Sequence, residues 1–127
     1  MADTHLPPQW RERLLAVVGA KAGDENLRLL DAWQRAEGGT AQWNPLNTTF
    51  DLPGTTDYNS TGVKNYGKAT WGVCATALTL TSGLYNGILG DLQGGGKTAE
   101  QIVSDRSAQF RKWGTNPALI QTILGGG

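Results

Sequence analysis

The sequence predicts a single, mainly helical (all-α) domain that is interrupted by one long polar loop or small hairpin. Three observations indicate this fold class. Apolar residues recur at three- to four-residue spacing over most of the chain, as in helices that bury one face. Glycine, proline and helix-capping residues separate these segments. Residues 38–68, in contrast, lack any sustained period. A chain of 127 residues can bury one core without disulfides, so we expect one domain over residues 1–127.

The first third of the chain predicts two helices. Pro8 stands near the first turn of a helix expected over residues 9–21. Asp24 is a natural N-cap for a second helix, which we expect to run to about Glu37. Gly38 then ends this helix, because glycine takes the left-handed C-terminal conformation without steric cost. The apolar stripes consist of Trp10, Leu14, Val17 and Val18 in the first helix and of Leu27, Leu30 and Trp33 in the second.

Residues 38–68 form the long connection, which is rich in Gly, Asn, Thr, Asp and Pro. We expect short strands at Thr48–Leu52 and around Val63. A connection of about thirty residues without strong elements is unusual in a compact domain and is usually functional.

Helical spacing returns after this connection. We expect helices over residues 69–82, 84–92, 98–113 and 118–124. Cys74 lies in the apolar run Val73–Ala75 and is expected to be a small buried residue. The predicted core contains Leu30, Trp33, Trp71, Leu78 and Phe110.

Composition excludes several classes of function. The formal net charge is zero and charged residues make up 17% of the chain, which argues against nucleic acid as a partner. His5 is the only histidine and Cys74 the only cysteine, so we expect no metal site, no cofactor and no disulfide within the chain. The longest apolar run is far too short to span a membrane, and residues 1–8 do not resemble a signal peptide.

Glu37 is the strongest candidate for a catalytic residue. It follows Trp33 by four positions, which places it on or beside the apolar stripe of its helix. The negative end of the helix dipole, together with partial burial, raises the pKa of a nearby carboxyl group. A glutamate that holds its proton near neutral pH is what a general acid requires. The alternative is an ordinary helix-end glutamate that points into solvent.

Asp51 and Asp57 are candidates for a second catalytic carboxylate. Both lie on the long loop, which can fold back across a cleft toward the end of the helix. Glycoside cleavage uses one carboxyl group as the acid and usually a second as base or nucleophile. The alternative for both residues is turn formation, since Asp57 precedes a turn-rich run.

The loop also combines aromatic rings with amides and hydroxyls. Sugars are bound by this mixture, because rings stack on their C–H faces and amides contact hydroxyl and N-acetyl groups. Each residue taken singly is also explained by turns or by the core. The nine residues are Trp43, Asn44, Asn47, Thr48, Thr49, Tyr58, Asn59, Asn65 and Tyr66.

The order of these motifs resembles the lysozyme-like superfamily, and most closely goose-type lysozymes and soluble lytic transglycosylases. The resemblance covers residues 24–92. It consists of Glu37 at a helix end, then Asn44-Pro45, a polar loop, and the segment Gly62-Val63-Lys64-Asn65-Tyr66 before a helix. The runs AEGGTAQWNPLNTT, DYNSTGVKNY and GVCATALTL are similar to domains in phages and phage tail proteins of actinobacterial hosts.

The resemblance implies a peptidoglycan-cleaving enzyme without a cofactor. Glu37 would protonate the oxygen of the β-1,4 bond between N-acetylmuramic acid (MurNAc) and N-acetylglucosamine (GlcNAc). Asn44 would shape the cleft. Candidate substrate-binding residues are Trp43, Asn44, Tyr58, Asn59, Gly62, Val63, Asn65 and Tyr66.

Two departures from the family pattern leave the reaction open. Lys64-Asn65 replaces the Met-Gln pair of the family, and Tyr85-Asn86 falls too early to be equated with the Tyr-Asn pair of the transglycosylases. No aspartate is fixed by the motif as a second carboxylate. Hydrolysis, with Asp57 or Asp51 assisting, and transglycosylation by Glu37 alone are both compatible with the sequence.

A non-catalytic module that docks a phage tail on the cell wall is the alternative function. Under either function the expected partner is the peptidoglycan glycan strand, together with other virion tail proteins. The expected location is the virion or the bacterial cell wall. An enzyme is favoured, because a passive binder has no need of a glutamate on an apolar face before two glycines.

Overall fold

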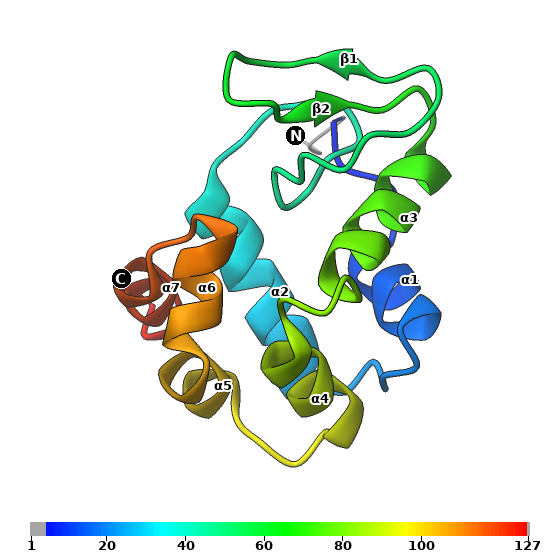
Figure 1. Cartoon of the computed structure of the whole chain (residues 1–127). Helices are drawn as coiled ribbons and strands as arrows, with labels where there is room; N and C mark the ends of the chain where they lie inside the picture. The colour runs from blue at the N-terminus through cyan, green and yellow to red at the C-terminus, as the bar shows by residue number, and fades with distance from the viewer. Residues whose placement is uncertain (1–4, 127) are drawn as a thin grey trace.

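A computed structural model of the chain describes residues 5–126. Within this range the chain is mainly helical, as the sequence predicts, with one small antiparallel sheet (Figure 1). Residues 1–4, on which the signal-peptide argument partly rests, and residue 127 lie outside the described range. The helices are α1 (Trp10–Val17), α2 (Asp24–Glu37), α3 (Ala69–Leu80), α4 (Asn86–Gly94), α5 (Ala99–Asp105), α6 (Ser107–Trp113) and α7 (Pro117–Leu124), and the strands are β1 (Thr56–Asp57) and β2 (Lys64–Asn65).

Helix α2 organises the core, since it contacts α1, α5 and α7. Leu30, Trp33 and Phe110 are fully buried, which confirms three of the predicted core residues. The Trp33 ring meets Phe110 edge-on, with ring centroids 4.8 Å apart. Figure 1 shows the C-terminal end of α2 directed toward the loop and hairpin, with α6 on one side and α3 on the other.

Helix α3 buries a different face from the predicted one. Leu78 is 38% exposed, Trp71 is only partly buried and Cys74 is exposed, so these three predictions are wrong. The cause is the close approach of Gly72 to the loop. A Cβ at this position would lie 1.6 Å from the backbone oxygen of Trp43, so only glycine fits. This contact turns the opposite side of the helix inward, and the residues buried there are Gly72, Val73, Ala75, Thr76, Ala77 and Leu80.

The predicted hairpin exists, but its strands are displaced along the sequence. β1 and β2 are two residues each, with Thr56 opposite Asn65 and Asp57 opposite Lys64. Thr48–Leu52, where a strand was expected, has no regular structure. The turn explains the register, because the Asn59 side-chain oxygen accepts hydrogen bonds from the backbone N–H groups of Thr61 and Val63.

The C-terminal helices also differ from prediction. The helix expected over residues 98–113 is divided at Arg106, whose φ of −114° is outside the helical range. Arg106 instead forms two hydrogen bonds with the buried Asp91 of α4, at 2.8 and 3.1 Å. α1 ends at Val17 rather than Lys21. None of the helices within residues 5–126 is long and apolar enough to cross a bilayer.

Candidate active site

Glu37 is the last residue of α2. The helix ends because Gly38 adopts the left-handed conformation (φ 61°) while its N–H still bonds to the carbonyl of Gln34, 3.1 Å away. The side chain of Glu37 is half-buried. The expectation of a partly buried carboxylate at a helix C-terminus is therefore confirmed.

Both carboxylate oxygens of Glu37 accept hydrogen bonds from uncharged side chains. Asn47 donates through Nδ2 to Oε1 over 3.1 Å. Thr115 donates its hydroxyl to Oε2. The hydroxyl oxygen of Thr115 in turn accepts from the indole N–H of Trp33, 3.0 Å away. A chain of donors from three separate segments thus holds the carboxylate in one orientation.

Backbone geometry places the two direct donors. Asn47 has a φ of 54°, a conformation that asparagine tolerates better than most residues. Its amide lies directly over Gly39, where a Cβ would be 2.0 Å from the Asn47 Oδ1. On the other side, Gly114 ends α6 in the left-handed conformation (φ 102°), and the buried Thr115 follows it. Gly39 is thus the residue that gives Asn47 access to Glu37.

The pKa of Glu37 is raised above its ordinary value. Burial is the main cause, because it disfavours the ionised form. The hydrogen bonds from Thr115 and Asn47, and to a smaller extent the nearby indole N–H of Trp33, act in the opposite direction, since donors stabilise the carboxylate. No charged side chain is among the causes. The protonation of Glu37 is therefore governed by burial and neutral dipoles.

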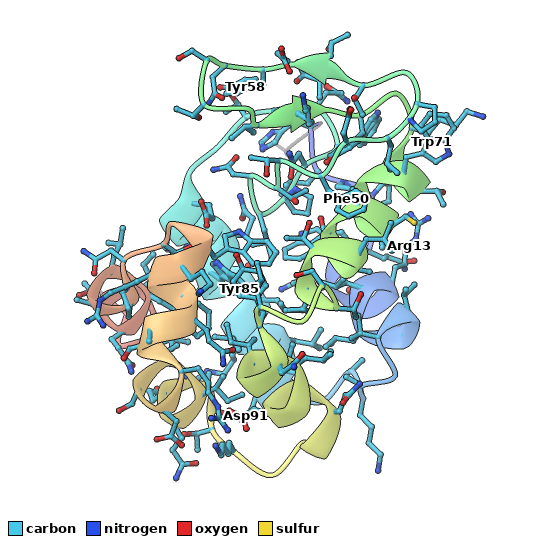
Figure 2. All side chains as sticks on the ribbon, viewed as in Figure 1. Arg13, Phe50, Tyr58, Trp71, Tyr85 and Asp91 are labelled. Atoms are coloured by element: carbon cyan, nitrogen blue, oxygen red, sulfur yellow. The ribbon has the colours of Figure 1, made fainter. Side chains whose placement is uncertain are left out.

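Glu37 is linked through Asn47 to a groove of about 250 Å³, although Glu37 itself is not among the residues that line this groove. Asn47 makes this link, because its amide contacts Glu37 and its side chain lines the groove. Trp113 packs against Trp33 on one side (4.9 Å between centroids) and against Tyr85 on the other (4.8 Å). Figure 2 shows Tyr85 between α6 and α3. The groove is lined by Asn47, Thr48, Thr49, Thr79, Tyr85, Lys112 and Trp113.

The two predicted partner carboxylates are elsewhere. Asp57 is exposed on β1 and forms an ion pair with Lys64, 2.6 Å away. Asp51 is exposed and accepts a hydrogen bond from Thr55 over 2.7 Å. The pKa of Lys64 is raised mainly by its hydrogen bond to Asp57 and lowered by burial, and the charge of Asp51 raises it slightly. Asp51 is not among the groups that affect the pKa of Glu37. Neither aspartate lines the groove.

Two predicted sugar-binding residues are buried and serve the loop itself. Asn44 is 1% exposed, and its amide binds the carbonyls of Thr48 (2.9 Å) and Lys64 (2.8 Å). Tyr66 is 2% exposed and donates its hydroxyl to the carbonyl of Phe50 over 2.5 Å. Direct contact of either side chain with a sugar is therefore excluded in this conformation. The shaping role expected for Asn44 agrees with its contacts.

The remaining predicted contacts lie on the hairpin or beneath it. Tyr58 is 43% exposed and its hydroxyl pairs with that of Thr40, 2.7 Å away (Figure 2). Asn65 accepts from the backbone N–H of Gln42 at 2.9 Å. The side chain of Asn59 forms the hairpin turn described above. Trp43, Gly62 and Val63 are partly buried, and none of these six residues lines the groove.

Several groove residues come from parts of the sequence that carried no functional prediction. Thr79 lies on α3, Tyr85 directly precedes α4, and Lys112 and Trp113 lie on α6. Thr115, which follows α6, does not line the groove but donates to Glu37 and was also not predicted. Tyr85 and Trp113 were recognisable only as members of inward helical faces. Asn47, Thr48 and Thr49 were within the polar-aromatic loop.

The site combines a half-buried carboxyl group of raised pKa with a groove of polar and aromatic residues. Within residues 5–126, no three His, Cys, Asp or Glu side chains are grouped to hold a metal ion.

No protein-family model, curated protein or solved structure matches the chain in sequence or fold comparisons.

Proposed function

We propose that this chain cleaves peptidoglycan at the β-1,4 bond between MurNAc and GlcNAc, with Glu37 as the general acid. The observation that carries the proposal is the environment of Glu37. A half-buried carboxyl group with a raised pKa is held by two neutral donors, and one of these donors, Asn47, lines a polar and aromatic groove.

This environment suits the first step of glycoside cleavage. A general acid must be protonated in the resting enzyme and must then stabilise the negative charge that it acquires. Burial supports the protonated form of Glu37, and the hydrogen bonds from Asn47 and Thr115 support the carboxylate. The same side chain can therefore occupy both states at a fixed position.

The groove supports a saccharide as the substrate. Trp113 is partly exposed and supplies an aromatic face, while Asn47, Thr49 and Thr79 supply amide and hydroxyl groups. Tyr85 and Thr48 are 6% and 2% exposed, so they shape the groove without offering a face to the sugar. Glycan strands offer C–H faces, hydroxyls and N-acetyl groups that match these two kinds of contact. The sequence resemblance to goose-type lysozymes and lytic transglycosylases points to peptidoglycan within this class.

The absence of a second carboxylate favours transglycosylation over hydrolysis. Asp57 is paired with Lys64 and Asp51 with Thr55, and no carboxylate is among the groups that affect the pKa of Glu37. In this reaction Glu37 gives its proton to the glycosidic oxygen as the bond to C1 of MurNAc breaks. The 6-hydroxyl of the same sugar then forms a bond to C1 and returns its proton to Glu37, which leaves a 1,6-anhydro end.

The test is mass spectrometry of the muropeptides that are released from purified peptidoglycan. We expect 1,6-anhydro products from the unmodified chain and none from Glu37→Gln. Reducing ends without the anhydro bridge would show that water is the acceptor. Glu12, which is exposed on α1, provides the matched control, because Glu12→Gln should cleave at the rate of the unmodified chain.

A wall-binding module without activity is the second candidate. One observation favours it, namely that both oxygens of Glu37 already have protein donors, as in a purely structural carboxylate. Sedimentation with peptidoglycan and turbidity loss of the same material separate the two functions. Binding without turbidity loss between about pH 4 and 8, a range that brackets the pKa expected of a catalytic acid, would support the wall-binding module. A phage particle and its tail proteins remain the proposed setting for both.

A further inference from the structure

The groove that Asn47 links to Glu37 is lined by a single formal charge, and this charge is positive. Six of its lining residues are uncharged, and the seventh is Lys112. Lys112 is in the last turn of α6 and is exposed, so its ammonium group can reach a ligand that occupies the groove.

Lys112 has no ion-pair partner within residues 5–126, and among the lysines described there it is the one that lines the groove. Lys64 pairs with Asp57 at 2.6 Å, and Lys97 pairs with Asp91 at 3.1 Å and with Asp105 at 3.0 Å. An ammonium group that is unpaired, next to two aromatic rings and several hydrogen-bonding groups, is suited to an anionic substituent on an otherwise neutral ligand.

A structural explanation for Lys112 also exists and makes a different prediction. Cations in the last turn of a helix are stabilised by the helix dipole. Arg111 occupies the same turn and is exposed, but it does not line the groove. If the helix dipole alone explains Lys112, then substitutions of Arg111 and of Lys112 should have equal effects on ligand binding.

The proposed substrate carries an anionic substituent of this kind. MurNAc differs from GlcNAc by a lactyl ether, whose carboxyl group is either free or joined to a peptide that has carboxylates of its own. A strand of GlcNAc alone has the same sugar faces and N-acetyl groups but no charge. A cation at the groove can therefore distinguish peptidoglycan from a neutral glycan.

We infer that Lys112 is a specificity-determining residue, which binds a carboxylate of the muramyl substituent and thereby selects peptidoglycan strands over neutral GlcNAc oligomers. This inference rests on the proposed function for the class of substrate. It does not depend on turnover, because it concerns binding.

The experiment measures binding in the Glu37→Gln background, where cleavage is removed. Dissociation constants are determined by calorimetry for two ligands of equal length, a peptide-bearing GlcNAc–MurNAc oligomer and a GlcNAc oligomer. Four proteins are compared, all of which carry Glu37→Gln. One has no further change, and the others also carry Lys112→Met, Lys112→Glu or the neighbouring control Arg111→Glu. Circular dichroism of each variant establishes that the helices are intact.

We expect Lys112→Met to weaken binding of the muramyl oligomer by about two- to five-fold, the range of an exposed ion pair, and Lys112→Glu to weaken it further. Binding of the GlcNAc oligomer should stay unchanged in both variants, and Arg111→Glu should alter neither ligand. The preference for the muramyl oligomer should also decrease with added salt.

Three results would overturn the inference: equal losses for both ligands, equal effects of Arg111 and Lys112, or no effect of Lys112. The proposed function fails separately, if the unmodified chain binds peptidoglycan but releases no muropeptides.

Discussion

Replacement of Thr115 by valine tests whether neutral donors set the protonation of Glu37. Valine has nearly the shape of threonine but cannot donate a hydrogen bond, so the substitution removes the hydroxyl contact to Oε2 of Glu37. Trp33 loses its acceptor on Thr115, but its indole N–H also lies close enough to Glu37 to lower the pKa of that carboxyl group. The buried side chain of residue 115 is otherwise unchanged in volume.

The magnitude follows from the difference between the two protonation states. A hydrogen bond to a charged group contributes about 1.5–3 kcal/mol, and one to a neutral group about 0.5–1.5 kcal/mol. The hydroxyl of Thr115 therefore favours the ionised form of Glu37 by about 1–1.5 kcal/mol. Because one pKa unit corresponds to about 1.4 kcal/mol, Thr115→Val should raise the pKa of Glu37 by about one unit.

The carboxyl carbon of Glu37 reports this pKa directly in a ¹³C NMR titration, which needs no catalytic activity. Thr122 is exposed on α7, donates its hydroxyl to the carbonyl of Ala118 and is not among the groups that affect the pKa of Glu37, so Thr122→Val is the control and should leave the titration unchanged. The alkaline limb of the cleavage rate should move to higher pH in Thr115→Val, since the acid stays protonated longer. A pKa of Glu37 that is unchanged or lower in Thr115→Val would refute the role assigned to the hydroxyl.

Three further predictions follow from the same contacts. Glu37→Gln should reduce cleavage by about 10²–10⁴-fold. The pKa of Glu37 is raised in the folded state, so the unmodified chain loses stability as pH rises and this carboxyl group ionises. Glutamine does not ionise, so the melting temperature of Glu37→Gln should exceed that of the unmodified chain by an amount that grows with pH. Gly39→Ala places a Cβ 2.0 Å from the Oδ1 of Asn47, so it should displace this amide and raise the pKa of Glu37 in the same titration. Gly23→Ala is the control, because a Cβ at that position has nothing within 4 Å, and it should leave the pKa of Glu37 unchanged. Asn44→Ala leaves buried backbone groups unpaired and should cost about 2 kcal/mol or more in urea unfolding.

The sequence was sufficient for features that depend on neighbouring residues. Glu37 follows the apolar stripe of its helix and precedes a glycine that must adopt a left-handed conformation, so its position at a helix end was predictable. The polar loop was predictable for the same reason, because its composition favours turns over helix or strand. Asn59 forms such a turn, although the strands that it joins lie several residues from the predicted ones.

Features that depend on distant contacts were not accessible from the sequence. The face that α3 buries is decided by the approach of Gly72 to the backbone of Trp43, and apolar spacing alone favoured the wrong face. Thr115 is 78 residues from Glu37, and nothing in its neighbourhood distinguishes it from other threonines. The sequence predicts that Tyr66 stacks on a sugar, because aromatic residues in polar loops can do so. In the structure its side chain is buried inside the loop and donates to the carbonyl of Phe50.

The opposing influences on Glu37 have a reason within the proposed reaction. A carboxyl group that is buried without donors stays protonated and cannot take back the proton of the attacking hydroxyl. A carboxyl group with donors but without burial is ionised at neutral pH and cannot supply the first proton. Both steps benefit when neither form is strongly favoured, and burial opposed by the hydrogen bonds from Asn47 and Thr115 acts toward this without a second charge. A site in which no second carboxylate affects the pKa of Glu37 is therefore consistent with a single glutamate that acts first as acid and then as base.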